Sequence, residues 1–143
     1  MARGLPGTTA TRISAGPRSP DPYRVLIVDD EEKIRELYLQ LLIRSGLDCV
    51  VDEAEDGLAA QAKVPVFRPH LIILDIVMPK LNGAQLCRWV RASGFADTKV
   101  LVTTANPSNG LFEQALEAGA DDWLPKPMRI GEFIGKVSQM LAG

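Results

Sequence analysis

The stretch "VLIVDD", residues 25–30, joins a short apolar run directly to two adjacent carboxylates. Its first four residues, Val25–Val28, are uncharged and largely β-branched, which predicts a strand buried within a sheet. Asp29 and Asp30 follow at once, and two like charges side by side repel each other. A fold keeps such a pair when it is solvated, when it caps a helix, or when a cation lies there. The local sequence leaves these three explanations open.

Short apolar runs alternate with amphipathic segments along the rest of the chain. Strands are expected at residues 23–28, 49–51, 71–74, 99–104 and 122–124. Helices are expected at residues 31–45, 56–64, around 86–90, about 108–118 and 130–141. This alternation predicts an α/β fold with a parallel sheet and helices on both of its faces.

Composition limits the classes of function. The chain has 143 residues, which favours one domain, and its net charge of −2 gives no indication of direct nucleic-acid binding. The longest apolar run, Leu71–Leu74, is far too short to cross a membrane. Cys49 and Cys87 lack the spacing of a metal site or a disulfide framework. Both are therefore expected to be buried in a protein of the reducing cytoplasm.

The first 21 residues differ in composition from the remainder. They are rich in Gly, Pro, Ser and Thr, and they contain no acidic residue before Asp21. Segments with few large apolar residues cannot bury enough surface to fold. Residues 1–21 are therefore expected to be a disordered tail or linker, and residues 22–143 to form the domain.

Polar side chains gather where the predicted strands end. They are Asp29 and Asp30, Asp75, Thr103 and Thr104, and Lys126. Sites in open parallel sheets form beyond these carboxyl ends of the strands. Carboxylate oxygens are ligands that Mg²⁺ prefers, and an Asp carboxylate is also a nucleophile for phosphoryl groups. The pattern indicates phosphoryl chemistry, which depends mainly on positioning and on neutralising charge.

Four stretches at these strand ends resemble the receiver domain of two-component response regulators. They are "VLIVDDE" (25–31), "LIILDIVMPKLNG" (71–83), "VLVTTA" (100–105) and "GADDWLPKP" (119–127). Their order and spacing match that family from about Tyr23 to Leu141. The resemblance implies a flavodoxin-like, doubly wound sheet of five parallel strands in the order 2-1-3-4-5, with five helices. It also implies a signalling switch rather than an enzyme.

The resemblance assigns the phosphoacceptor and the metal ligands. Asp75 would accept the phosphoryl group. Mg²⁺ would be bound directly by Asp30, largely through water by Asp29, by Asp75, and by the backbone carbonyl of Val77.

The resemblance also assigns the residues that would bind phosphate and respond to it. Thr104 would bond a phosphoryl oxygen, Lys126 would pair with the phosphate, and Trp123 stands at the position of the family's switch aromatic. Strand alternation sends Thr103 and Thr104 to opposite faces. The family's Thr-Ala pair favours Thr104. Trp123 could equally be only a core residue.

The partners follow from the same resemblance. A sensor histidine kinase or a histidine phosphotransfer protein would donate the phosphoryl group. The surface formed by helix four, strand five and helix five would then change, and it would bind a downstream protein or a second copy. The sequence is compatible with a stand-alone receiver and with one domain of a longer regulator.

Three alternative interpretations remain. Asp29–Asp30–Glu31 could simply cap a helix, with Asp30 or Glu31 as the capping residue. An Asp-nucleophile phosphatase would need a second acid two residues after Asp75, where this chain has Val77. A receiver-like binding module that is never phosphorylated is the third. Two positions also depart from the family's best-known pattern: Asn106 stands where an acid is usual, and Val77 replaces a polar residue of members that lose phosphate quickly. Because Val77 cannot orient water, slow hydrolysis of the phosphorylated form is expected.

Overall fold

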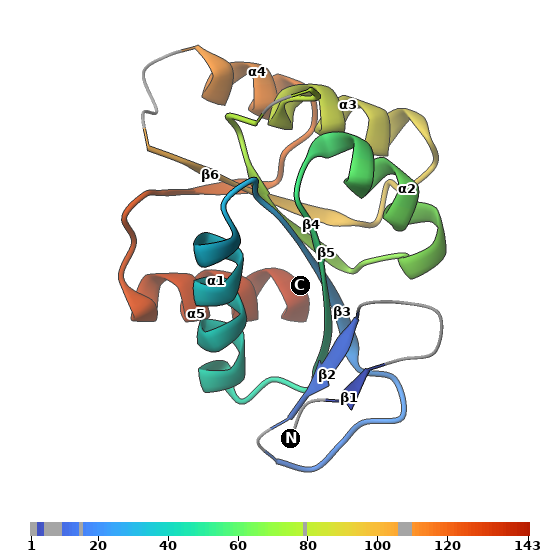
Figure 1. The fold of residues 1–143 in the computed structure, drawn as a ribbon, viewed down its shortest axis with the longest axis vertical. Coiled ribbons are helices and arrows are strands. Elements are labelled where there is room, and N and C mark those ends of the chain that lie inside the picture. Colours follow the sequence, from blue (N-terminus) through green and yellow to red (C-terminus); the bar gives the residue numbers. More distant parts are fainter. Residues whose placement is uncertain (1–2, 5–9, 15, 79, 106–109) are drawn as a thin grey trace.

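The computed structural model describes residues 3–4, 10–14, 16–78, 80–105 and 110–143. A sheet of seven strands lies between two layers of helices (Figure 1). The strands are β1 (Arg3–Gly4), β2 (Thr11–Ile13), β3 (Tyr23–Val28), β4 (Cys49–Ala54), β5 (Leu71–Asp75), β6 (Lys99–Thr104) and β7 (Asp122–Pro125). The helices are α1 (Glu32–Ser45), α2 (Gly57–Phe67), α3 (Gly83–Ala92), α4 (Leu111–Glu117) and α5 (Ile130–Ala142). Pro79 and Asn106 lie outside the described residues.

Five of the strands form the parallel sheet that the sequence predicts. Their spatial order is β4-β3-β5-β6-β7, which is the expected order 2-1-3-4-5. Every neighbouring pair among them is parallel. The chain order reverses between β3 and β5, so the carboxyl ends of these two strands lie side by side. The doubly wound α/β fold is confirmed.

The sheet has two more strands than the sequence analysis expected. β2 pairs antiparallel with β4, placing Thr11 opposite Val51, and β1 pairs antiparallel with β2. Ile13 is 3% exposed and Ala10 is fully buried. A three-residue strand is too short to show an alternating pattern of apolar residues, so the sequence did not predict this strand. It forms by pairing with the edge of β4, which is open in the five-stranded sheet. The boundary between a tail and a domain at residue 21 stays a prediction.

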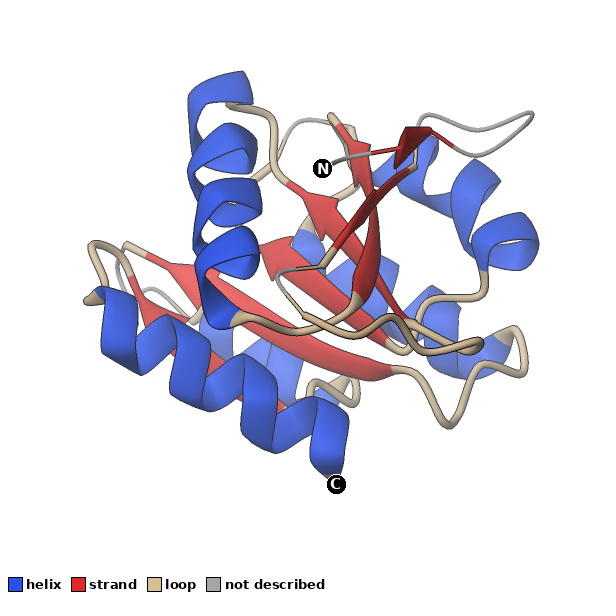
Figure 2. Cartoon of the chain, turned by 90° about the horizontal axis from the view of Figure 1, so that it is seen from below, coloured by secondary structure: helices blue, strands red, loops and turns tan. Residues whose placement is uncertain are grey.

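The helices divide between the two faces of the sheet (Figure 2). α1 and α5 cover one face around a core that contains Leu42 and Phe133, and α2, α3 and α4 cover the other. On α1 the structure buries Tyr38, whose ring stacks on Phe133 at 5.2 Å. Leu37, which the helical pattern placed on the apolar face, is 49% exposed. Among the described residues, no helix is both long and apolar enough to span a bilayer.

Two helix ends show how far local sequence rules reach. α1 ends, as expected, at Gly46, which adopts the left-handed backbone angle φ 77° that glycine tolerates. α2 was expected to end before Pro65 but continues to Phe67. The backbone N–H of Arg68 donates to the carbonyl of Val64 at 2.8 Å and closes this last turn. A proline near the end of a helix therefore did not stop it.

Candidate functional site

The turn after β3 presents its two carboxylates differently. Asp29 is fully buried, whereas Asp30 is exposed. The backbone N–H of Asp29 donates to the carbonyl of Ala54 at 3.2 Å, and Asp29 Oδ1 accepts from the N–H of Glu31 at 2.9 Å. Glu31 occupies the N-cap of α1 but makes no capping bond with its side chain. Neither Asp30 nor Glu31 therefore acts as the side-chain cap.

Asp75 is the last residue of β5 and is 8% exposed. Its Oδ1 accepts from the backbone N–H of Val77 at 3.2 Å. α3 begins close behind it, because a Cβ atom at Gly83 would lie 2.8 Å from Ile76 Cα and 2.9 Å from the Asp75 carbonyl oxygen. Only glycine allows the start of α3 to lie this close to the end of β5, where Asp75 stands.

Lys126 joins the two buried carboxylates. Its Nζ lies 2.9 Å from Asp29 Oδ2 and 3.3 Å from Asp75 Oδ2. The backbone N–H of Lys126 donates to the carbonyl of Thr104 at 2.8 Å, which fixes the chain after β7 against the end of β6. The peptide bond to Pro127 is cis. The structure thus brings together residues from three separate strand ends.

The three carboxylates form one cluster. Asp29, Asp30 and Asp75 each offer an oxygen atom, and these atoms all lie within 4.8 Å of one another. Two of the groups are buried, and the third, Asp30, is exposed to solvent. An all-oxygen donor set of this kind fits a hard divalent cation such as Mg²⁺. Val77 follows at the rim with its side chain 56% exposed.

Burial and charge shift the pKa values of the central pair. Burial raises the pKa of the Asp75 carboxyl above its usual value, and the Asp29 carboxylate raises it further, while Lys126 opposes both effects. Burial by itself would lower the pKa of Lys126, but its bond to Asp29 and the charge of Asp75 raise it above the ordinary value. The ammonium therefore stays charged and offsets the repulsion between the carboxylates.

The two threonines at the end of β6 face opposite sides of the sheet. Thr103 is in register with Asp75, and its buried hydroxyl lies near that of Tyr38 but makes no hydrogen bond to any described residue. Thr104, 1% exposed, lies on the other face, as does Trp123, which is in register with Val102. The Trp123 ring packs edge-on against Phe112 of α4, with centroids 4.9 Å apart.

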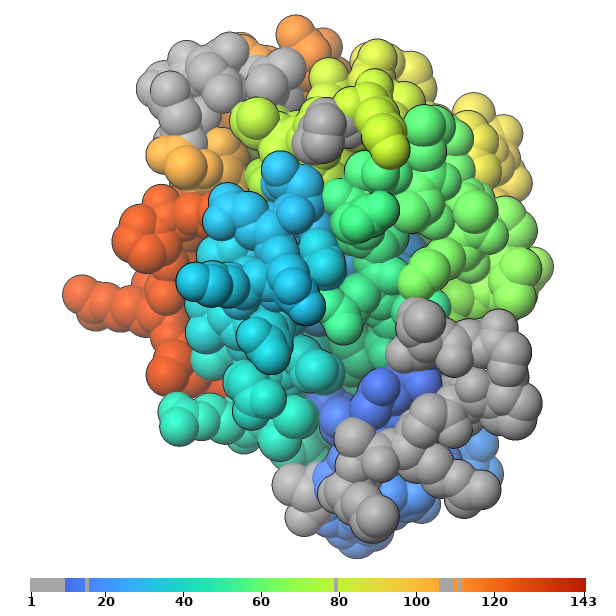
Figure 3. Space-filling view, viewed as in Figure 1, coloured from blue at the N-terminus to red at the C-terminus, as the bar shows by residue number. Residues whose placement is uncertain are grey.

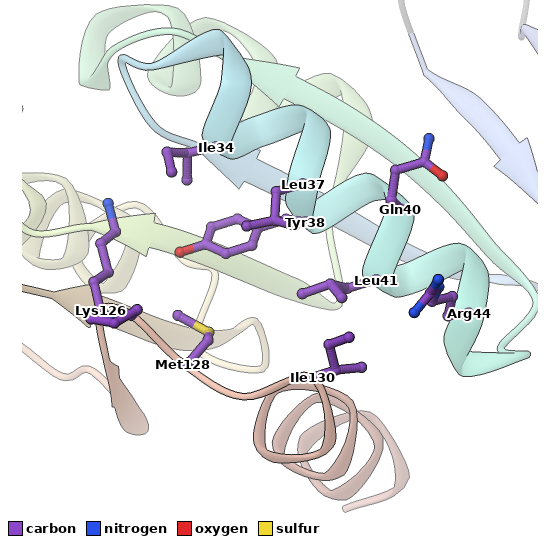
Figure 4. Close-up of a pocket in the computed structure, with 10 residues that line it drawn as sticks. Ile34, Leu37, Tyr38, Gln40, Leu41, Arg44, Lys126, Met128 and Ile130 are labelled. Atoms are coloured by element: carbon purple, nitrogen blue, oxygen red, sulfur yellow. The ribbon is translucent and has the colours of Figure 1, made fainter.

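A groove lies between α1 and the segment that leads from Lys126 into α5. It encloses about 570 Å³, and apolar side chains form most of its walls. Tyr38 lies on its floor with the hydroxyl directed towards Lys126, which lines its inner end (Figure 4). The sequence analysis placed residue 38 among helix residues without a function. A tyrosine on the buried stripe of a helix was the signal, because a buried hydroxyl needs polar surroundings.

The sequence analysis also missed residues that brace the two carboxylate turns. Arg35 donates to the carbonyl of Asp29 at 2.7 Å and to Glu53 Oε1 at 3.0 Å. Lys80 Nζ donates to Asp56 Oδ2 at 3.2 Å. Glu53 lies 18 residues from Arg35, and Asp56 lies 24 residues from Lys80, so no spacing rule could have linked these pairs.

Comparison with known proteins gives one consistent result. The family model of the response regulator receiver domain matches residues 25–138. The response regulator MprA of Mycobacterium sp. (strain KMS) is 38% identical over 120 residues, which are 84% of this chain and 51% of that protein. The chain thus spans about half the length of the curated relatives it matches.

Solved structures share the fold. The chemotaxis protein CheY4 of Vibrio cholerae has a TM-score of 0.73 and 32% identity, covering 85% of this chain and 99% of that one. The receiver domain of a sensor histidine kinase from Pseudomonas aeruginosa PAO1, determined with a magnesium ion coordinated in the active site cleft, has a TM-score of 0.77 and 25% identity, covering 86% and 100%. The chain belongs to the response regulator receiver domain family of two-component signalling.

Proposed function

We propose that this receiver domain is switched by Mg²⁺-dependent phosphorylation of Asp75. One observation carries the proposal: Lys126 Nζ bridges Asp29 and Asp75 within a cluster of three carboxylates. Such a cluster is electrostatically costly, and the surrounding fold retains it at a sheet edge where ligands bind.

The same cluster supplies the cation site. Asp30, Asp29, Asp75 and the Val77 carbonyl would hold Mg²⁺, which supplies neutralisation of the phosphoryl oxygens when it is bound. The oxygen donors within 4.8 Å of one another support this assignment. The magnesium ion in the Pseudomonas aeruginosa receiver structure supports it as well.

The phosphoryl donor is a phosphohistidine on a sensor histidine kinase or a histidine phosphotransfer protein. A carboxylate oxygen of Asp75 attacks phosphorus, the bond between phosphorus and the imidazole nitrogen breaks, and the nitrogen keeps the electron pair. Lys126, freed from part of its pairing with Asp75, offsets the charge of the transferred group. Cys49 and Cys87 are free and buried, which suits a reducing cytoplasm as the place of this exchange.

The response of the fold begins at Thr104 and Trp123. The Thr104 hydroxyl bonds a phosphoryl oxygen and moves towards Asp75. Trp123 shares its face of the sheet and packs on Phe112, so the space and contacts of α4 change with it. The surface of α4, β7 and α5 then binds a downstream protein or a second copy of the domain.

A direct experiment tests the phosphoacceptor. We expect incubation with Mg²⁺ and a small acyl phosphate to add one phosphoryl group that is stable in acid and labile in base. Intact-protein mass spectrometry measures the adduct, and Asp75→Ala serves as the control that lacks it. Turnover of many phosphoesters would instead indicate a phosphatase. Absence of any adduct would indicate a binding module that is not phosphorylated.

A further inference from the structure

The short segment Glu53–Asp56, which runs from the end of β4 into α2, touches both turns that carry the carboxylates. Figure 3 shows α1 in cyan at the centre of one face of the molecule, with α5 in red and α2 in green on either side. The carbonyl of Ala54 accepts a hydrogen bond from the N–H of Asp29 at 3.2 Å. Glu53 and Asp56, on either side of Ala54, each form an ion pair. The partner of Glu53 is Arg35 of α1, and the partner of Asp56 is Lys80 in the loop after β5.

The first ion pair holds the turn after β3. Arg35, on the second turn of α1, donates from Nε to Glu53 Oε1 at 3.0 Å. Its NH1 group donates to the backbone carbonyl of Asp29 at 2.7 Å. The Arg35 side chain is only 15% exposed, so the guanidinium has little freedom to leave these partners. The planar fork therefore ties the Asp29–Asp30 backbone to β4.

The second ion pair holds the loop after β5. Asp56 caps α2 through a hydrogen bond from the N–H of Ala59 at 2.8 Å, and its other oxygen accepts from Lys80 at 3.2 Å. These two contacts, in that order, lower the pKa of the Asp56 carboxyl, whose side chain is 8% exposed. Lys80 adopts φ 69°, a left-handed angle that a residue with a side chain rarely takes. The Lys80 side chain is 59% exposed, so solvent screens part of this ion pair.

Close backbone packing reinforces the second contact. A Cβ atom at Gly57 would lie 2.6 Å from both the Cβ atom and the carbonyl oxygen of Leu81. The first residue of α2 is thus pressed against the loop that follows Asp75. Any movement of the α2 start would be transmitted to that loop, because protein interiors have little free space.

We propose that Glu53–Asp56 is the common anchor of the cation site, and that Arg35 and Lys80 are positioning residues that fix its two ligand-bearing turns. The inference rests on the proposed function, since it concerns the Mg²⁺ site of the phosphoacceptor. Neither residue touches the acceptor oxygen. Each determines where the oxygen donors stand before the ion arrives.

Positioning and simple electrostatics predict opposite results, which makes the proposal testable. Replacing a cationic side chain near three carboxylates should strengthen cation binding if charge alone matters. Loss of an orienting contact instead weakens metal binding, typically by about tenfold or more. We therefore expect Lys80→Gln and Arg35→Gln each to weaken Mg²⁺ binding by about tenfold, measured by NMR titration of the backbone amides.

Two further variants separate the ion pair from general effects of charge. Asp56→Asn keeps a good helix cap but loses the ion pair with Lys80, so it should match Lys80→Gln, and the double variant should be no weaker than either single one. Glu55→Gln removes a charge from the same segment at an exposed residue that makes neither ion pair, and it should bind Mg²⁺ almost as wild type does. Phosphorylation by a small acyl phosphate at saturating Mg²⁺ should return close to the wild-type rate, since only the half-saturating concentration changes.

Failure of the anchor and failure of the proposed function give different results. Lys80→Gln or Arg35→Gln protein that binds Mg²⁺ as tightly as wild type, or more tightly, overturns the anchor. Weakening by Glu55→Gln equal to that by Asp56→Asn overturns it too. Wild-type protein that neither binds Mg²⁺ nor forms a phosphoryl adduct overturns the proposed function itself. Thermal unfolding of each variant shows that the protein measured is folded.

Discussion

Asp75 is a residue whose surroundings work against its own charge. It is buried and lies beside the Asp29 carboxylate, and among the described residues Lys126 and the backbone N–H of Val77 favour its ionised form. Enzyme and signalling sites commonly keep such groups at the expense of stability. The pKa of Asp75 is raised as a result, so the charged carboxylate lowers the stability of the fold at neutral pH.

Asp75→Asn should raise the free energy of unfolding at neutral pH. The pKa of Asp75 is raised in the folded state, so the unfolded chain releases this proton more readily than the folded one. Wild-type stability therefore falls as the pH rises from the unfolded pKa, roughly 4, through the folded pKa. The difference between Asn and Asp should be largest near pH 7 and vanish below about pH 4. Urea unfolding across this pH range measures it, and a gap that does not depend on pH would contradict the argument.

Val77 should set the lifetime of the phosphorylated state. Its side chain is exposed at the rim of the site and offers no group that could orient a water molecule for attack on phosphorus. Val77→Asn should shorten the lifetime of the Asp75 phosphate several-fold, followed by loss of the adduct over time in Mg²⁺. Equal decay in the two proteins would show that water is oriented elsewhere.

Individual residues also show where sequence reasoning stops. The sequence predicted that the side chains of Thr103 and Thr104 lie on opposite faces of the sheet. Which of them shares a face with Trp123 follows only from the register between β6 and β7. The pattern of strand ends grouped Lys126 with Asp75, but their separate roles could be assigned only through the resemblance, because each alone is an ordinary surface or turn residue. The contacts of Tyr38 depend on how α1 is rotated about its axis on the sheet. The apolar pattern did not determine this rotation, because Leu37, an apolar residue of the same helix, is half-exposed.

At the level of helices and strands, Arg91 connects more segments than its position near the end of α3 suggests. It donates to the carbonyl of Gly119 at 2.8 Å, to that of Thr98 at 2.6 Å and to the Asp121 carboxylate at 2.7 Å. Asp121 in turn accepts from the N–H of Val100 at 2.7 Å. One side chain thus links α3 to the segments that lead into β6 and β7.

Arg91→Ala should lower the free energy of unfolding by about 2–3 kcal/mol, because it leaves several partly buried carbonyls without a donor. Arg88→Ala is the matched control, since Arg88 lies on the exposed side of the same helix. Chemical denaturation compares the two variants with wild type. Equal losses in both variants would mean that the carbonyls are satisfied by water.

For the molecule as a whole, β2 is the feature that the sequence concealed. The parallel core was predictable because each of its strands is an apolar run bounded by turn residues. Residues 11–13 are Thr, Arg and Ile, and they lie in a segment rich in glycine, proline and threonine, so Ile13 is their one large apolar side chain. Their order depends on an edge of β4 that only the assembled sheet provides. The ion pair of Arg12 with Asp48, at 2.7 Å, adds a second long-range contact.

Ile13→Ala tests whether this segment belongs to the folded domain. Truncating a buried isoleucine typically costs about 2 kcal/mol or more, whereas a change in a disordered tail costs nothing. We expect the larger effect, measured by thermal or urea unfolding, with the exposed Lys33→Ala as control. Wild-type stability in the Ile13 variant would support the interpretation of residues 1–21 as a tail.

The bridge from Lys126 to Asp29 has a consequence for the chain during its synthesis. The three acidic groups are all made before residue 80, whereas the ammonium that offsets their charge comes from the last fifth of the sequence. A partly folded chain in which β7 has not yet docked would therefore lack the charge that compensates this cluster. Docking of β7 is thus the folding step that neutralises the cluster, and only a domain in which β7 has docked would present the proposed site complete.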